Sequence, residues 1–198
     1  VIGFIEDYSP ALAFTSGIIY SSNQLTREDY PTTVQVYPDG RFEASYMATN
    51  PEFAYITFKN NRFEFYTEPG QTLALRLKVT ADQNVELIGF EGPLAADNQQ
   101  FKDFDWGKNP RFFYQGMEKT LKEQPISAIK KQIVTAWDSV QNDVNKRLAK
   151  SSFSAKLKNL IQTDVALYYA VQLMDLQMYR QDYLRSNPAN TFLQEPLP

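Results

Sequence analysis

Two missing amino acids limit the chemistry that this chain can carry out. Its 198 residues include no cysteine and no histidine. Thiolate nucleophiles, disulfides, histidine-ligated metals and imidazole general bases are therefore excluded. Any reaction would have to use carboxylates, lysines, tyrosines or serines.

Pairs of acidic residues are the first candidates for such chemistry. They are Glu6 with Asp7, Glu28 with Asp29, and Asp103 with Asp105. Two carboxylates can serve a glycosidase, and carboxylate oxygens can bind calcium. None of the pairs lies in the glycine-bearing acidic loop of a calcium motif, so we interpret them as surface charge. A hydrolase is accordingly the weakest functional hypothesis.

Glycine and serine motifs add no catalytic site. The run Gly89-Phe90-Glu91-Gly92 lacks the further glycines and the βαβ context of a phosphate- or dinucleotide-binding loop, so it indicates a corner between a strand and a helix. The chain has no Gly-x-Ser-x-Gly nucleophile elbow. We predict no catalytic residue, no cofactor and no metal, and therefore no enzyme.

Aromatic side chains are the nearest feature to a binding site. The chain has 14 Phe, 12 Tyr and 2 Trp, enough to build platforms on which sugar rings stack. An exposed row formed by Tyr20, Tyr30 and Tyr37 would indicate a carbohydrate- or small-ligand-binding module. The competing interpretation is that aromatic residues fill the core of a β-rich protein, because they favour strands.

The charge balance argues against a nucleic-acid partner. The net charge is -3 and the isoelectric point is about 5.1, which gives no general attraction to phosphate. Residues 1–92 carry 6 Lys and Arg against 12 Asp and Glu, whereas residues 93–198 carry 14 against 11. This change of sign predicts two structural halves. No run approaches the roughly 18 apolar residues of a membrane span. Since the chain opens at Val1, we interpret it as a processed or trimmed product.

The first half, residues 1–92, has the short β-branched and aromatic runs of a β domain. The predicted strands are Val1–Glu6, Gly17–Ser21, Thr32–Tyr37, Arg41–Met47, Phe53–Phe58, Arg62–Thr67, Thr72–Thr80 and Val85–Gly89. Pro38-Asp39-Gly40 predicts a tight hairpin turn, and Lys59-Asn60-Asn61 predicts a second one. We expect an antiparallel β-sandwich or open barrel of about eight strands.

The second half, residues 93–186, has the period of helices. A short helix is predicted within Leu94–Phe104 and another around Gln115–Lys122, followed by a long helical hairpin. Its first helix carries the apolar stripe Ile126, Ile129, Ile133, Trp137, Val140, Val144 and Leu148. Its second helix begins after a Ser154 cap, runs to about Ser186, and has a predicted inner side of Leu157, Leu160, Ile161, Val165, Tyr168, Val171, Met174 and Met178. The predicted fold class is α+β, with residues 187–198 as a tail or linker.

The second long helix also offers a candidate docking surface. Tyr169, Tyr179 and Tyr183 provide more aromatic area than one helical hairpin needs to bury, and aromatic residues are enriched in protein interfaces. We predict that a partner docks there if these side chains are exposed. The competing interpretation is that they pack within this chain.

Motifs in the first half carry a resemblance to a known family. In order, they are Val1-Ile2-Gly3-Phe4-Ile5, Pro38-Asp39-Gly40-Arg41-Phe42, Tyr66-Thr67-Glu68-Pro69-Gly70-Gln71-Thr72-Leu73 and Gly89-Phe90-Glu91-Gly92-Pro93-Leu94-Ala95-Ala96-Asp97-Asn98. Together they resemble the N-terminal region that precedes the thioredoxin-like domain of bacterial envelope thiol-disulfide oxidoreductases, which are often lipoproteins. The resemblance covers residues 1–105 by motif and the helical remainder by the order of its elements.

The resemblance implies an accessory module and not a catalyst. The reactive Cys-x-x-Cys of that family belongs to the following domain, and redox activity cannot be assigned to any residue here because this chain has no cysteine. The implied location is the periplasm or cell envelope, with a lipid anchor on the precursor in lipoprotein members. The implied partner is a thioredoxin-like domain or another envelope protein. A carbohydrate- or small-ligand-binding module stays open as the alternative.

Overall fold

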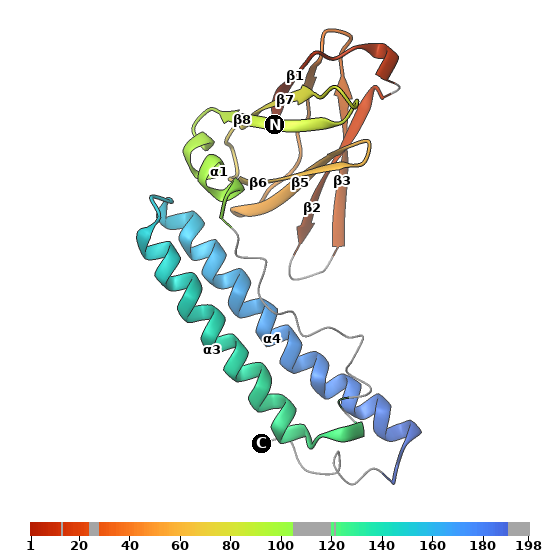
Figure 1. Ribbon diagram of the computed structural model, residues 1–198, viewed down its shortest axis with the longest axis vertical. Helices are drawn as coiled ribbons and strands as arrows, with labels where there is room; N and C mark the ends of the chain where they lie inside the picture. The colour runs from red at the N-terminus through yellow and green to blue at the C-terminus, as the bar shows by residue number, and fades with distance from the viewer. Residues whose placement is uncertain (13, 24–27, 105–119, 121, 190–198) are drawn as a thin grey trace. The chain divides into compact units, whose positions relative to one another are not determined.

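The computed structural model describes residues 1–12, 14–23, 28–104, 120 and 122–189. The chain forms two compact units. The first comprises Val1–Asp105 with Ser152–Leu157, and the second comprises Trp106–Ser151 with Lys158–Pro198. A β-sheet dominates the first unit and two long helices dominate the second (Figure 1). The predicted α+β class is confirmed.

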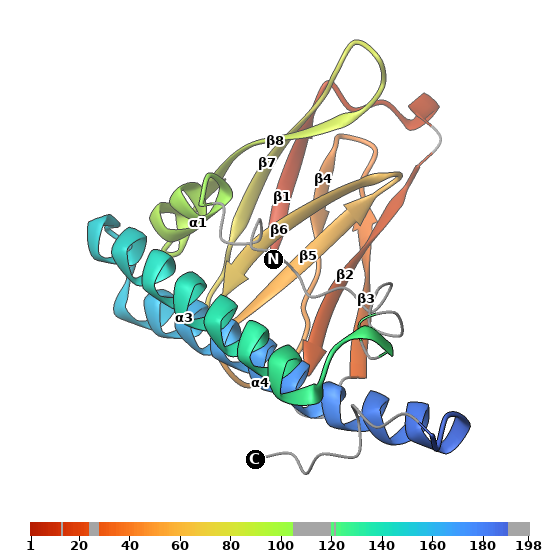
Figure 2. The ribbon, with the colours of Figure 1, turned by 60° about the horizontal axis from the view of Figure 1, so that its bottom comes forward.

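The sheet of the first unit has eight strands and is a nearly closed barrel. The strands are β1 (Ile2–Glu6), β2 (Ser16–Asn23), β3 (Glu28–Val36), β4 (Arg41–Glu43), β5 (Glu52–Phe58), β6 (Asn61–Thr67), β7 (Ala74–Val79) and β8 (Val85–Glu91), with a 3-10 helix at Pro10–Leu12. Their order in the sheet is β6-β5-β2-β3-β4-β1-β7-β8. The two end strands, β6 and β8, contact each other, and Figure 2 shows the curl of the sheet. Each of the eight predicted strands is present.

One strand pair departs from the antiparallel prediction. β1 lies between β4 and β7, and it runs antiparallel to β4 but parallel to β7, with Ile2 opposite Ala74 and Glu6 opposite Lys78. Hairpin turns impose antiparallel pairing only on strands that follow one another in the chain. β1 and β7 are far apart in sequence, so no turn constrains their direction, and the barrel is mixed.

Two glycines fix the position of β1. Gly40 ends the predicted Pro38-Asp39-Gly40 turn with a φ of +86°, and a side chain there would lie 2.6 Å from the carbonyl oxygen of Ile5. That close approach lets the Ile5 N–H donate to the Gly40 carbonyl oxygen at 2.9 Å. Gly3 faces inward, where a Cβ would lie 2.5 Å from the carbonyl oxygen of Leu75. Larger residues at these two positions would push β1 away from its neighbours.

The second hairpin has its left-handed residue at an unexpected place. Phe58 pairs with Asn61, so the loop between β5 and β6 consists of Lys59 and Asn60. The positive φ falls on Lys59, at 52°, although asparagine tolerates that conformation better. The turn was predicted correctly, but the residue types alone indicated the wrong residue for its strained position.

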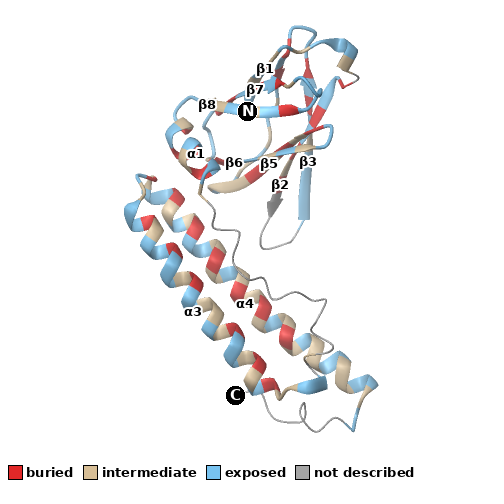
Figure 3. Ribbon diagram, viewed as in Figure 1, coloured by how far each residue is buried: buried red, intermediate tan, exposed pale blue. Residues whose placement is uncertain are grey.

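Alternation along the strands separates a buried inner face from an exposed outer face (Figure 3). In β7 and the residue before it, the predicted inward set Leu73, Leu75, Leu77 and Val79 is buried. The other strands contribute Ile5, Ile19, Val34, Val36, Phe42, Ala54, Ile56, Phe58 and Phe65 to the same core. Burial of this apolar area is the main force that stabilises the barrel.

Helix α1 (Ala95–Lys102) closes the gap between the ends of the sheet, because it packs on both β6 and β8. Its buried residue Asn98 accepts a hydrogen bond from the Tyr66 N–H at 2.7 Å and donates to the Tyr66 carbonyl oxygen at 2.9 Å. A side-chain amide therefore satisfies the backbone of end strand β6 where a further strand would otherwise pair. Phe101 stacks on Phe53 of β5, with ring centroids 4.8 Å apart.

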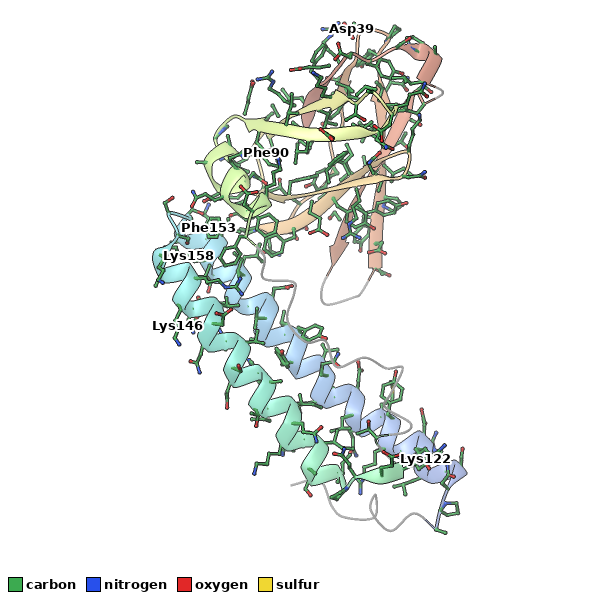
Figure 4. All side chains as sticks on the ribbon, viewed as in Figure 1. Asp39, Phe90, Lys122, Lys146, Phe153 and Lys158 are labelled. Carbon is green, nitrogen blue, oxygen red and sulfur yellow. The ribbon has the colours of Figure 1, made fainter. Side chains whose placement is uncertain are left out.

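Residues 152–157 belong to the first unit, where α1 and the residue Phe104 after it hold them. Gln100 accepts hydrogen bonds from both the N–H and the hydroxyl of Ser152. Asp97 accepts the Ser154 N–H at 2.8 Å, and the Ser154 hydroxyl caps the next helix by accepting the Leu157 N–H at 3.3 Å. The ring of Phe153, labelled in Figure 4, meets Phe104 edge to face. The predicted cap at Ser154 is thus present.

The second unit contains most of the helical hairpin, formed by α3 (Ile126–Lys150) and α4 (Ala155–Ser186). Buried positions recur along both helices (Figure 3). The buried residues of α3 are Ile126, Ile129, Ile133, Val140, Val144 and Leu148. This matches the predicted stripe except at Trp137, which is only half-buried and stacks on Tyr169 of α4 with ring centroids 6.1 Å apart. The predicted helix around Gln115–Lys122 lies largely outside the described residues.

The predicted inner side of α4 is wrong in its second half. Leu157, Ile161, Val165, Tyr169, Gln172 and Leu176 are buried, whereas Leu160, Tyr168 and Val171 are half-buried and Met174 and Met178 are exposed. The buried positions follow steps of four, four, four, three and four. The prediction selected apolar residues, so after Val165 it chose Met174 and Met178, which lie on a neighbouring face of the helix. The polar Gln172, which is buried, was not selected.

None of the helices in the described part of the chain combines the length and the hydropathy that crossing a membrane requires.

Candidate functional site

The outer face of the barrel bears a groove over β4, β1, β7 and β8. Because β1 alternates, Gly3 and Ile5 face the core, and Ile2 and Phe4 face outward. Ile2 is 45% exposed and Phe4 is 42% exposed. The groove has a volume of about 630 Å³ and is lined by Ile2, Gly3, Phe4, Tyr37, Arg41, Phe42, Glu43, Ala74, Leu75, Arg76 and Glu91. We call it the outer-face groove.

Strand register arranges the outward residues of this groove in two rows across the strands. The acidic row consists, in order, of Glu43 (β4), Ile2 (β1), Ala74 (β7) and Glu91 (β8). The basic row lies two residues away on each strand, later in β1 and β7 and earlier in β4 and β8, and consists of Arg41, Phe4, Arg76 and Gly89. Each row therefore has an apolar residue on β1 and two residues of one charge on other strands of the groove.

The charged side chains of the groove make ion pairs at its rim. Arg76 Nη2 lies 2.5 Å from Glu6 Oε1, and Arg76 Nε lies 3.8 Å from Glu91 Oε1. Glu6 raises the pKa of Arg76 by hydrogen bonding to it. At the other side, Arg41 Nε lies 2.7 Å from Asp39 Oδ2. All of these side chains are at least partly exposed, so the pairs stabilise the fold only slightly.

Tyr37 links the turn before β4 to the groove. Its hydroxyl donates to Glu43 Oε1 at 3.1 Å, and this hydrogen bond raises the pKa of Tyr37. The turn itself is held by Asp39, which accepts the Arg41 N–H at 3.1 Å and whose pKa is lowered by that bond and by the Arg41 side chain. Asp39 is labelled in Figure 4 at the tip of this turn. The aromatic ring and the charged rim are thus fixed by local hydrogen bonds.

The structure does not bring the three predicted ligand-binding tyrosines into one row. Tyr37 lines the outer-face groove. Tyr20 lies opposite Pro31 of β3, six residues before Tyr37, which corresponds to about 20 Å along the strand. Tyr30 is opposite Ser21, which is buried, so strand alternation places Tyr30 on the inner face of the sheet. It lies near the end of the barrel.

Tyr20 belongs to a separate aromatic cluster on the outer face. It stacks on Tyr55 of β5 with ring centroids 4.9 Å apart, and the Arg62 guanidinium lies 3.6 Å from the centroid of the Tyr55 ring. Arg62 also pairs with Glu64 at 2.7 Å. The interaction between a cation and an aromatic face is attractive, so the aromatic and charged groups of this cluster already stabilise one another.

The predicted docking tyrosines divide in the same way. At Tyr169 the competing interpretation, packing within this chain, holds, because its side chain is only 1% exposed and lies against Trp137. It lies on the buried stripe of α4, at the step of four after Val165. Tyr179 and Tyr183 are half-buried, and the Lys122 amine lies 6.0 Å from the Tyr183 ring centroid.

Glu6, Asp7 and Glu28 of the predicted acidic pairs have local partners. Glu6 pairs with Arg76, and Asp7 Oδ2 lies 3.8 Å from the Lys78 amine. Glu28 accepts the Tyr30 hydroxyl at 2.9 Å. Asp105 lies outside the described residues. Within the part of the chain that is described, no three acidic side chains gather as metal ligands would.

A polar cluster lies on the inner face at one end of the barrel. Ser21 donates to Glu52 Oε1 at 2.9 Å, and Glu52 is opposite the buried Thr67. Burial raises the pKa of Glu52. Burial also raises the pKa of Tyr46 to about 12, although the neighbouring Thr67 side chain opposes that rise. Ionising Glu52 or Tyr46 at this end of the core therefore costs free energy.

Sequence reasoning missed most residues of the outer-face groove. Val1–Ile5 is apolar at nearly every position, which indicates a strand but not which residues face outward. The signal that was available was Gly3 between two large residues, since a glycine in a strand often marks close backbone approach. The neighbours of β1 depend on the parallel pairing with β7, which local sequence does not specify.

Searches against models of protein families, curated proteins and solved structures give no match for this chain. The outer-face groove, with its apolar centre and charged rim, therefore provides the main basis for a functional assignment.

Proposed function

We propose that this chain is a noncatalytic accessory module of a cell-envelope protein and that it binds another protein through the outer-face groove. One observation carries the proposal: β1, in the interior of the sheet order, exposes Ile2 and Phe4 side by side. Contiguous exposed apolar side chains with a polar rim are typical of interaction surfaces. The charged residues of both rows supply that rim.

The class of partner rests on the resemblance of the first half to the region that precedes thioredoxin-like domains. It makes a thioredoxin-like domain, or another protein of the periplasm or envelope, the proposed partner. In this proposal the thiol chemistry belongs to the partner, because the exchange reaction needs a thiolate and this chain has no cysteine.

Calorimetric titration with a purified thioredoxin-like envelope domain that contains Cys-x-x-Cys tests the proposal. We expect saturable binding that Phe4→Glu reduces at least about tenfold, because a charge would be placed in the apolar centre. Ile18→Glu is the matched control, since Ile18 is an exposed apolar residue of β2 that does not line the groove. Absence of binding, or equal losses in both variants, would contradict the proposal.

An insulin-reduction assay tests the noncatalytic part separately. The isolated chain should give the same rate as buffer, because no residue can attack a disulfide. A rate above that of buffer would refute the accessory role.

A small-ligand site is the second candidate function, favoured by Tyr37. Its ring lines a groove of about 630 Å³ beside Arg41 and Glu43, and ligand pockets commonly measure about 300–1,000 Å³. Titration with a panel of neutral oligosaccharides distinguishes the two functions. Binding that Tyr37→Ala abolishes would favour a carbohydrate module, and the absence of any heat change would leave protein binding as the function.

A further inference from the structure

We propose that a second copy of this chain docks on the outer-face groove, so that the two grooves face each other across a two-fold axis. The inference rests on the proposed function, because it uses the same protein-binding surface, for which the second copy and the thioredoxin-like domain would compete. It makes the module a pairing device that would bring two envelope chains together.

The groove is self-complementary in charge. A two-fold axis that runs parallel to the two rows, midway between them, turns the acidic row of one copy onto the basic row of the other. Glu43 of each copy then faces Arg41 of the other copy. The same operation repeats this contact on both sides of the axis, so each pairing counts twice.

The rows are also complementary in size. Across the proposed axis, Ile2 meets Phe4, so the two exposed apolar residues of one copy cover those of the other. Ala74 faces the long side chain of Arg76. Glu91 faces Gly89, where a Cβ would meet nothing within 4 Å, so the position leaves room for a long side chain. On β7 and β8 a short residue thus lies opposite a long one, and on β1 the two apolar residues meet.

The ion pairs within each copy do not prevent this exchange. Arg76 keeps its contacts with Glu6 and Glu91, since it faces Ala74 of the other copy, so the pair that is exchanged is Arg41 with Asp39, which are 72% and 53% exposed. Exposed pairs of this kind contribute little to stability, so replacing them by pairs between copies costs little. Around an apolar centre the new pairs lose water and specify the orientation of the two copies.

Sedimentation equilibrium of the full chain and two charge-reversal variants tests the inference. Arg41→Glu alone places two like-charged pairs across the axis, and so does Glu43→Arg alone. Each should raise the dimer dissociation constant at least about tenfold. An equimolar mixture of the two variants restores opposite charges at both contacts, so the mixture should form heterodimers about as tightly as the wild type forms homodimers.

A matched control is available on β6. Like Arg41 and Glu43, Arg62 and Glu64 are exposed and two residues apart on one strand, but they pair with each other and lie outside the groove. Arg62→Glu and Glu64→Arg should leave the dissociation constant within about twofold of the wild-type value. Thermal melting of all four variants establishes that each is folded.

Two results would overturn self-association. One is a wild-type chain that stays monomeric at every concentration, and the other is a mixture no tighter than either variant alone. If the monomeric chain still binds the thioredoxin-like domain through Phe4, only the second-copy inference fails and the proposed function stands. If neither association occurs, both fail.

Discussion

The barrel and the helical hairpin each leave large apolar side chains exposed, but the exposure has a different meaning in the two regions. In β1, Ile5 is fully buried while Ile2 and Phe4 are exposed, and the pairing with β4 and β7 fixes this arrangement residue by residue. In α4, Met174 is 71% exposed on a helical surface beside a buried stripe. A strand has only two faces, so an exposed apolar residue there is specified by register. A helix offers a continuous surface, so exposure at a single position indicates less.

The largest expected difference is between the two faces of the barrel. Phe65→Ala should lower the free energy of unfolding by about 3–5 kcal/mol, because Phe65 is fully buried. Phe4→Ala, on the exposed outer face, should cost less than about 1 kcal/mol. Urea denaturation followed by far-UV circular dichroism measures both. Equal losses would show that Phe4 supports the fold and not a binding surface.

The closure of the barrel by α1 provides the next effect. Asn98→Ala removes three hydrogen bonds, two to the Tyr66 backbone and one to the Leu94 carbonyl oxygen, and leaves buried groups unsatisfied. We expect a loss of about 2–4 kcal/mol in the same denaturation experiment. Asn60→Ala, at an exposed turn, is the control and should change stability by less than about 0.5 kcal/mol. A similar loss in the control would contradict the role of Asn98.

Trp137→Ala tests how much a side chain of the helical hairpin contributes to stability. A fully buried tryptophan typically contributes about 3–5 kcal/mol, but Trp137 is half-buried, so we expect a loss of about 1–2 kcal/mol. The loss of its stacking on Tyr169 is included in that value. Met174→Gln should lie within about 0.5 kcal/mol of the wild type. If urea denaturation shows that Trp137→Ala loses at least as much free energy of unfolding as Phe65→Ala, our ranking of the two regions is contradicted.

The smallest effect depends on pH. Burial raises the folded-state pKa of Glu52 above its ordinary value of 4.5, so the folded state binds this proton more tightly than the unfolded state. The stability that Glu52 contributes is present below pH 4.5 and is lost as the pH rises through the folded-state pKa. Glu52→Gln should therefore raise the Tm at pH 7 by a few degrees and leave it unchanged near pH 4. A variant that melts below the wild type at pH 7 would contradict this sign.

Local sequence predicted the elements of the fold more successfully than their arrangement. The eight strands, the Pro38-Asp39-Gly40 turn and the Ser154 cap follow from residue types that act over a few neighbours. The parallel pairing of β1 with β7 and the use of Asn98 to cover the end of β6 depend on contacts between distant segments. Such contacts leave no periodic signal in the chain.

The candidate site was predicted only at Tyr37, and the reason is the same. Tyr37 lies beside a recognisable turn, whereas the exposure of Phe4 depends on the strands that flank β1. Tyr169 was proposed as a docking residue from the composition of its helix, and it is buried. Its position in a tyrosine-rich helix indicated available aromatic surface, but the steps of four from Leu157 place it on the buried stripe. In α4, helical geometry and not composition determines which side chains are buried.

Hydrogen–deuterium exchange of the full chain, compared between dilute and concentrated samples and with the thioredoxin-like domain added, tests the central claim most directly. We expect association to slow exchange in β1, β4 and β7, the strands under the outer-face groove, and to leave β2 and β5 unchanged. Protection confined to α4 or to the Tyr20 and Tyr55 cluster would contradict the claim that this chain binds protein through the groove over β1.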